Sequence, residues 1–129
     1  MNKNILKEIA NKIKEAKTVL LIPHIIIDGD TLGSSVALCV ALRNLGKTAH
    51  ILIEDEIPSY LRFLDNNYCT YDQRIVDEPD LSIAIDCSDI GRFPLRQEKF
   101  LSGKSSINLD HHKTNQLFAD LNYVNEDAS

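Results

Sequence analysis

Short, uninterrupted apolar runs alternate along this chain with segments of helical periodicity, and this alternation constrains the fold more than any other feature of the sequence. The runs predict strands at residues 18–22, 48–53, 81–85, 105–109 and 121–124. Apolar residues at helical spacing predict helices at residues 5–16, 32–45 and 95–101. Strands that are apolar on both faces are typical of a parallel sheet covered by helices on both sides. The sequence therefore predicts an α/β fold with a doubly wound, mainly parallel sheet and helices on both of its faces.

The predicted helix at residues 32–45 has a defined inner face and a defined end. Its inward-facing side chains are expected to be Leu32, Val36, Cys39, Val40 and Leu45. Gly46 follows where a left-handed residue commonly ends a helix. Residues 54–80 are acidic and irregular, and we expect a solvated connection that contains a short helix within residues 57–64.

Length and composition limit the classes of protein to which the chain can belong. Its 129 residues, of which 43% are hydrophobic and 26% charged, suit one globular domain. No apolar run is long enough to span a membrane, and residues 1–15 are too charged for a signal peptide, so we expect a cytoplasmic protein. The net charge of −5 argues against a protein that coats duplex DNA. The three cysteines form no metal-binding pair, and Cys39 and Cys87 are expected to be buried free thiols.

Side chains that can bind metal ions follow three of the predicted strands. They are His24, Asp28 and Asp30 after the first strand, Asp86 after the strand at 81–85, and Asp110, His111 and His112 after the strand at 105–109. The carboxyl ends of parallel strands meet at one edge of the sheet, about 5 Å apart, so we expect these groups to converge. Taken alone, the stretch DHHKTN at residues 110–115 fits a metal site, a general base or a polar strand end equally well.

Four carboxylates in a small volume either have raised pKa values or are accompanied by cations. Carboxylates mixed with imidazoles suit manganese, iron or zinc better than calcium, and the number of groups suggests two ions that share a bridging carboxylate. Asp28 and Asp30 are expected to point the same way on extended backbone, and the adjacent His111 and His112 to opposite sides. The helix that follows Asp30 would favour an anion at its N-terminus.

Three segments, taken in order, resemble the first signature motifs of the DHH phosphoesterase superfamily. They are HIIIDGDTLGS at residues 24–34, the strand-end Asp86, and DHHKTN at residues 110–115. The resemblance extends from His24 to about Ala128, and the TN after DHHK is most similar to the oligoribonuclease and pAp phosphatase branch. It implies a phosphoesterase that hydrolyses short oligoribonucleotides or pAp with two Mn²⁺ ions, or with other divalent metals in their place.

The resemblance also implies which residues hold the metal ions. The first Mn²⁺ would be bound by His24, Asp28 and Asp86. The second would be bound by Asp30, Asp86 and His111, so that Asp86 bridges the two ions.

Further roles in catalysis and substrate binding follow from the same resemblance. Asp110 would hold a metal ligand by a hydrogen bond, and His112 would face the scissile phosphate. Arg92 would clamp a phosphate through its forked guanidinium, with a surface salt bridge as the alternative. Ser34 and Asn115 are weaker candidates for contact with the substrate.

The sequence departs from the pattern of the family in three ways. Ile27 stands where the family usually has Pro, and Thr31 where Ala is common. The family's fourth motif, which supplies a further metal-binding Asp, and its second, Gly-rich substrate-binding domain lie beyond the matching region. Residues 1–129 are thus expected to be an N-terminal DHH domain, incomplete at its C-terminus, that alone binds manganese weakly and turns over poorly.

Other functions remain open at this point. Within the same class the chain could belong to a family II pyrophosphatase-like enzyme or a cyclic-dinucleotide phosphodiesterase. In other classes it could be a metal- or nucleotide-binding fragment without turnover, or a structural α/β domain whose polar strand ends are incidental. The expected partner is a short RNA or a nucleotide phosphoester, with neither duplex DNA nor a membrane, and a homodimer is one state that the full-length protein could adopt.

Overall fold

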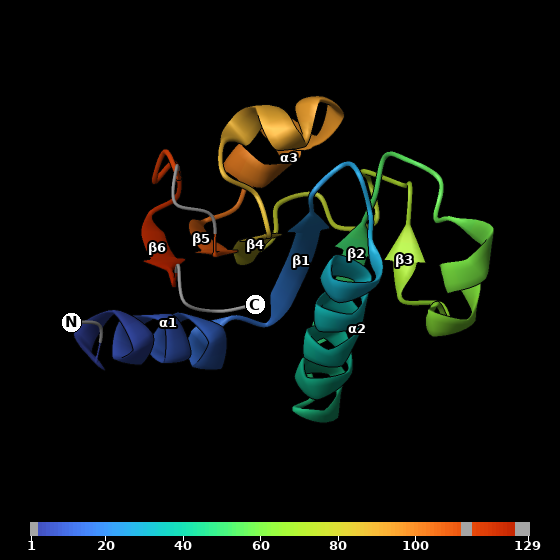
Figure 1. Cartoon of the computed structure of the whole chain (residues 1–129). Coiled ribbons are helices and arrows are strands. Elements are labelled where there is room, and N and C mark those ends of the chain that lie inside the picture. Colours follow the sequence, from blue (N-terminus) through green and yellow to red (C-terminus); the bar gives the residue numbers. More distant parts are fainter. Residues whose placement is uncertain (1–2, 112–114, 126–129) are drawn as a thin grey trace.

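The computed structural model describes residues 3–111 and 115–125, which form a six-stranded sheet with parallel strand pairings (Figure 1). The strands are β1 (Thr18–Pro23), β2 (Thr48–Leu52), β3 (Cys69–Thr70), β4 (Leu81–Ile85), β5 (Ser105–Asp110) and β6 (Leu121–Val124). The helices are α1 (Lys3–Glu15), α2 (Gly29–Asn44) and α3 (Gln97–Leu101), and the 3₁₀ segments are η1 (Ser59–Leu64), η2 (Ile90–Arg92) and η3 (Pro94–Arg96). The predicted α/β fold is confirmed.

Apolar side chains alternate between two cores, one on each face of the sheet. On the first face, α1 and α2 cover residues such as Val19 and Leu21 of β1. On the second face, Leu20 and Ile22 of β1 face a separate core that includes Phe93 and the α3 residue Phe100, whose ring centroids lie 5.2 Å apart. Because both faces are covered, the central strands β1 and β4 are apolar at nearly every position, which is why they read as continuous runs. Figure 1 shows α3 on the side of the sheet opposite to α1 and α2.

The order of the strands, β3-β2-β1-β4-β5-β6, reverses direction at β1. The chain first moves outward from β1 to β2 and β3, and then returns to the other side of β1 with β4. The loops after β1 and β4 therefore leave the sheet in opposite directions and open a crevice between them. Ligands of open α/β sheets bind at such a switch point, beyond the carboxyl ends of the strands.

Both ends of α2 are closed by local hydrogen bonds. Asp28 caps the N-terminus, and at the C-terminus Gly46 has φ of 84° while Lys47 N–H donates to the Leu42 carbonyl at 3.1 Å. The left-handed Gly46 is thus confirmed, but the prediction that Leu45 faces inward is wrong, because its side chain is 70% exposed. Within residues 3–111 and 115–125, no helix combines the length and apolar character needed to cross a membrane.

The structure differs from the predicted elements in three places. Helix α2 begins at Gly29, three residues earlier than expected, because Asp28 supplies the cap there. The connection at 54–80 contains a two-residue strand, β3, which pairs with Ile51 and Leu52 of β2 and was not predicted. The expected helix at 95–101 is divided into η3 and the short α3.

Asp80 connects the start of β1 to the loop before β4, and its carboxylate makes a testable contribution to stability. It accepts the Lys17 and Thr18 N–H groups at 2.8 and 3.2 Å, and the Lys17 bond is the main reason that its pKa lies below the ordinary value of 3.8. Asp80→Asn is expected to lower the free energy of unfolding by about 1 kcal/mol at neutral pH. Because the lowered pKa stabilises the fold only above the unfolded-state value, the wild type should lose this advantage as the pH falls through the folded-state pKa. Urea unfolding of the wild type and of Asp80→Asn between pH 7 and 2.5 measures whether their free energies of unfolding converge in acid. A difference in free energy that stays constant as the pH falls would contradict the prediction.

Candidate metal centre

Asp86 is the first residue after β4, and its backbone bends the chain toward the switch point. Its φ is 64°, in the left-handed region that Asp and Asn tolerate better than most residues. Its N–H still donates to the Leu109 carbonyl at 2.9 Å, so the pairing with β5 continues through the bend. Asp86 Oδ1 lies 2.6 Å from His111 Nε2, and Asp86 Oδ2 accepts the Thr31 hydroxyl at 2.7 Å.

Asp110 ends the neighbouring strand β5 and is only 7% exposed. Its Oδ2 accepts the Asn115 side-chain N–H at 2.7 Å, and Asn115 also donates to the Cys87 carbonyl at 3.2 Å. Ligand atoms of Asp86, Asp110 and His111 all lie within 4.8 Å of one another. The predicted convergence of strand-end groups is therefore found for these three residues.

Asp28 and Asp30 stand at the start of α2, on the other side of the crevice. Asp28 is the N-cap residue, and its Oδ1 accepts the Thr31 N–H at 2.8 Å. This bond is the largest cause that holds the Asp28 pKa below its ordinary value. Asp30 lies in the first helical turn, so the expectation that both carboxylates sit on extended backbone is wrong. The cap places Asp30 on a helical backbone, where side chains two apart diverge.

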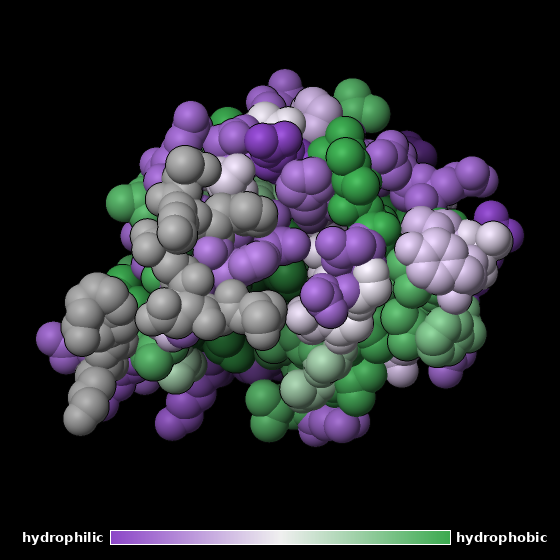
Figure 2. All heavy atoms as spheres, viewed as in Figure 1, coloured by the Kyte–Doolittle hydropathy of each residue, from purple (hydrophilic) through white to green (hydrophobic). Residues whose placement is uncertain are grey.

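One pocket, with a volume of about 470 Å³, connects these groups. Its polar lining is Asp28, Asp30, Thr31, Ser34, Asp86, Asp110, His111 and Asn125, and its apolar lining is Leu6, Leu38, Ile85, Leu109 and Tyr123. In the described part of the chain, four carboxylates line this pocket with neither lysine nor arginine among them. Figure 2 shows hydrophilic residues gathered over the N-terminal end of α2, in the middle of the view. Such a set of like charges favours bound cations.

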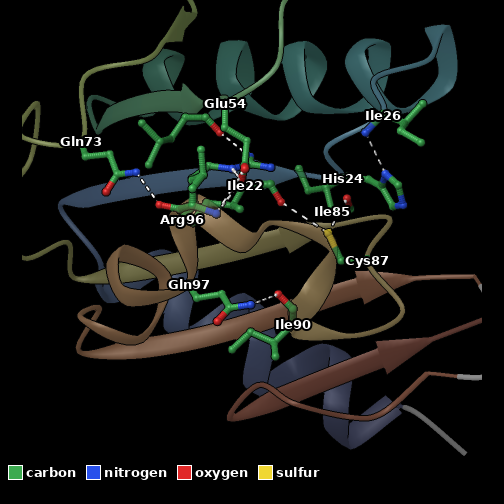
Figure 3. Close-up of polar contacts among 12 residues, drawn as sticks. Ile22, His24, Ile26, Glu54, Gln73, Ile85, Cys87, Ile90, Arg96 and Gln97 are labelled. Carbon is green, nitrogen blue, oxygen red and sulfur yellow. Dashed lines mark hydrogen bonds and ion pairs between the residues drawn. The ribbon is translucent and has the colours of Figure 1, made fainter.

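His24 follows β1 as predicted, but its ring is held by its own loop. Its Nδ1 accepts the Ile26 N–H at 2.9 Å (Figure 3), and its backbone N–H donates to the Ile85 carbonyl at 3.1 Å. Since Nδ1 accepts, a neutral ring carries its proton on Nε2, and neither nitrogen then offers a lone pair to a metal ion. Among the residues described, His24 is not part of the pocket lining. Ligation by His24 would require the Ile26 bond to break.

The remaining predicted site residues are Arg92, Ser34, Asn115 and His112, and of those that the structure describes, Ser34 lines the pocket. Arg92 Nε lies 3.4 Å from Asp89 Oδ2, with its side chain 51% exposed, and within the described ranges Arg92 does not line the pocket. Ser34 lines the pocket from the exposed side of α2, whereas Asn115 holds Asp110. His112 lies outside the described residues.

The donor set fits a divalent transition metal. Carboxylate and imidazole ligands together are the mixture that manganese, iron and zinc accept. The 2.6 Å contact between His111 Nε2 and Asp86 Oδ1 brings an imidazole nitrogen and a carboxylate oxygen, two kinds of ligand atom, to one place. Asp86, Asp110 and His111 form the centre of this set, with Asp28 and Asp30 on the opposite wall of the pocket.

Thr31 and Asn125 also line the pocket but were not predicted as site residues. Thr31 is 2% exposed and bonds to two of the predicted metal ligands, Asp28 and Asp86. Its place within the segment DGDT, three residues after a capping Asp, was the one signal in the sequence that could have indicated a structural link to the site.

The fold agrees with comparisons with known proteins. The model of the DHH family, N-terminal domain, matches residues 18–129, and the chain belongs to this family of phosphoesterases. The bifunctional oligoribonuclease and PAP phosphatase NrnA of Thermus thermophilus is 33% identical over 109 residues, which are 82% of this chain and 31% of that protein. The chain thus spans about a third of the length of this relative.

Two solved structures share the fold. An exopolyphosphatase-related protein from Bacteroides fragilis matches with a TM-score of 0.89 and 19% identity, over 98% of this chain and 40% of that one. The exonuclease RecJ bound to manganese matches with a TM-score of 0.58 and 23% identity, over 96% of this chain and 32% of that one.

Proposed function

We propose that this chain is the metal-binding domain of a manganese-dependent phosphoesterase that hydrolyses short oligoribonucleotides, pAp or both by a two-metal mechanism. The observation that carries the proposal is the cluster of Asp86, Asp110 and His111 at the switch point of the sheet, facing Asp28 and Asp30 across one pocket. The named relative that is both an oligoribonuclease and a PAP phosphatase, and the structural neighbour bound to manganese, support it.

In this proposal the side chains of the pocket would hold two divalent ions next to the bound substrate. Asp86 would be shared by the two ions, with His24 and Asp28 on one side and Asp30 and His111 on the other, and His24 would first have to release the Ile26 N–H. Asp110, held by Asn115, would hold a metal ligand by a hydrogen bond. Bound divalent ions supply Lewis-acid stabilisation of phosphoryl oxygens and an activated water molecule. Ser34 lies on the exposed rim of the pocket, where its hydroxyl can donate to a phosphate. Arg92 and His112 remain proposed phosphate contacts.

The choice among phosphoester substrates is part of the proposal. Pyrophosphate and cyclic dinucleotides are the alternatives within the class, and a metal- or nucleotide-binding domain without turnover is the alternative outside it. Substrate selection and a homodimer are proposals for a protein of the relative's length, of which this chain spans about a third.

Hydrolysis assays can separate these functions. The purified chain, and any longer product that the gene encodes, would be incubated with Mn²⁺ and one of pAp, an RNA dinucleotide, pyrophosphate or a cyclic dinucleotide, and the products separated by chromatography. We expect cleavage of pAp or the RNA dinucleotide, slow with residues 1–129 alone. If only pyrophosphate, or only the cyclic dinucleotide, were cleaved, that compound would be the substrate in place of pAp and short RNA. Bound Mn²⁺ without turnover by the longer product would favour the non-catalytic alternative.

A further inference from the structure

Thr31 links the two sides of the crevice through hydrogen bonds of its backbone and its side chain. It is 2% exposed and lies in the first turn of α2. Its N–H donates to Asp28 Oδ1 at 2.8 Å, and its hydroxyl donates to Asp86 Oδ2 at 2.7 Å. One residue therefore contacts a carboxylate that follows β1 and a carboxylate that follows β4.

The direction of the Thr31 hydroxyl sets it apart from an ordinary helical threonine. Hydroxyls of Ser and Thr inside helices commonly donate to the carbonyl four residues earlier. Ser35, one turn further along α2 and fully buried, does this by donating to the Thr31 carbonyl at 2.8 Å. Thr31 instead donates to a side chain 55 positions away in the sequence. Thr31 stands in the first turn of α2, where the residue four positions earlier, Ile27, precedes the helix, so its hydroxyl can donate to a partner outside the helix.

Asp86 has a particular need for such a partner. Its left-handed backbone takes the side chain out of the regular alternation of β4, so the strand alone does not determine where the carboxylate points. A donor on Oδ2 and His111 on Oδ1 hold the two oxygens from opposite sides.

We propose that Thr31 is a positioning residue, whose hydroxyl holds the Asp86 carboxylate in the orientation required to bind metal. This inference rests on the proposed function, because it assigns Asp86 to the metal centre. Groups that orient metal ligands by hydrogen bonds typically change metal affinity about 10- to 100-fold when they are removed. Thr31→Val is the sharpest variant, since valine keeps the branched shape and the backbone N–H that caps Asp28, and removes only the hydroxyl, which contacts Asp86 and also the Asp28 carboxylate.

The test measures Mn²⁺ binding to the whole chain by electron paramagnetic resonance, which reports free and bound ions without enzymatic activity. We expect Thr31→Val to weaken Mn²⁺ binding about 10- to 100-fold, and Thr31→Ser, which restores the donor, to bind like the wild type. Ser35→Ala is the matched control, because it removes a buried hydroxyl from the same helix that donates only to a helical carbonyl. Its Mn²⁺ affinity should be unchanged. Urea unfolding without metal shows whether each variant is folded.

Four results would overturn the inference, and they point to three different causes. Wild-type affinity in Thr31→Val would remove the positioning role while the metal site stands. Equal losses in Thr31→Val and Ser35→Ala, or no recovery in Thr31→Ser, would assign the effect to damage of the helix. Failure of the wild type itself to bind Mn²⁺ would overturn the proposed metal centre, and the role of Thr31 with it.

Discussion

Replacement of Asp86 by Asn is expected to weaken Mn²⁺ binding by more than about 100-fold, beyond the range of substitutions that only orient a ligand. Asp86 is the group on which the cluster converges, since it contacts both His111 and Thr31 and lies within 4.8 Å of Asp110 through their ligand atoms. Asn is chosen because it tolerates the left-handed backbone at this position and keeps the size of the side chain. The change therefore removes one negative charge and one carboxylate oxygen with little cost to the fold. Titration with Mn²⁺, followed by paramagnetic resonance, gives the affinity.

Asp89→Asn is the matched control for this substitution. Asp89 belongs to the same loop, where its Oδ1 accepts the Gly91 N–H at 2.8 Å and its Oδ2 faces Arg92. In the described structure it is not part of the pocket lining, so its variant should bind Mn²⁺ like the wild type. If both variants lost affinity equally, the loop rather than the Asp86 carboxylate would be responsible. Undiminished binding by Asp86→Asn would favour a structural domain whose polar strand ends are incidental.

The fold could be predicted because the strands of the central sheet are buried on both faces. Residues of β1 and β4 are apolar almost without interruption, and a pattern of this kind depends on local sequence alone. Strand β3 could not be predicted in the same way, because it has two residues and exists through its pairing with β2. The start of α2 was missed for a similar reason, since Asp28 serves both as a helix cap and as a wall of the pocket.

The candidate site could be predicted as a set of residues but not as a set of contacts. The positions of Asp86 and Asp110 follow from the ends of their strands, which the apolar runs define. The Nδ1 contact of His24, the Asp89 partner of Arg92 and the bond from Asn115 to Asp110 depend on loop conformations. No periodicity in the sequence encodes these conformations, because each loop is shaped by the elements that it connects.

Arg96→Met is expected to lower the free energy of unfolding by about 3–5 kcal/mol. Arg96 is 1% exposed, and its Nε donates to Glu54 Oε1 at 2.7 Å (Figure 3). Its Nη1 donates to the Leu52 carbonyl at 2.6 Å. Methionine fills much of the space of the side chain but leaves the Glu54 carboxylate, which is 6% exposed, without its cation. A buried charge that loses its partner is far more costly than an exposed one. Urea unfolding at neutral pH measures the loss.

Two further variants identify the uncompensated charge as the cause. Glu54→Gln, added to Arg96→Met, removes the charge but keeps an oxygen that can accept the Leu95 N–H, as Glu54 does at 3.1 and 3.3 Å. The double variant should therefore be more stable than Arg96→Met alone, although it contains one more substitution. Arg62→Met is the matched control at the exposed pair with Glu56, 3.9 Å apart, and should cost less than about 1 kcal/mol. A double variant no more stable than Arg96→Met would contradict this explanation. The loss of stability would then come from lost packing and the lost hydrogen bond to Leu52, and not from the unpaired charge of Glu54.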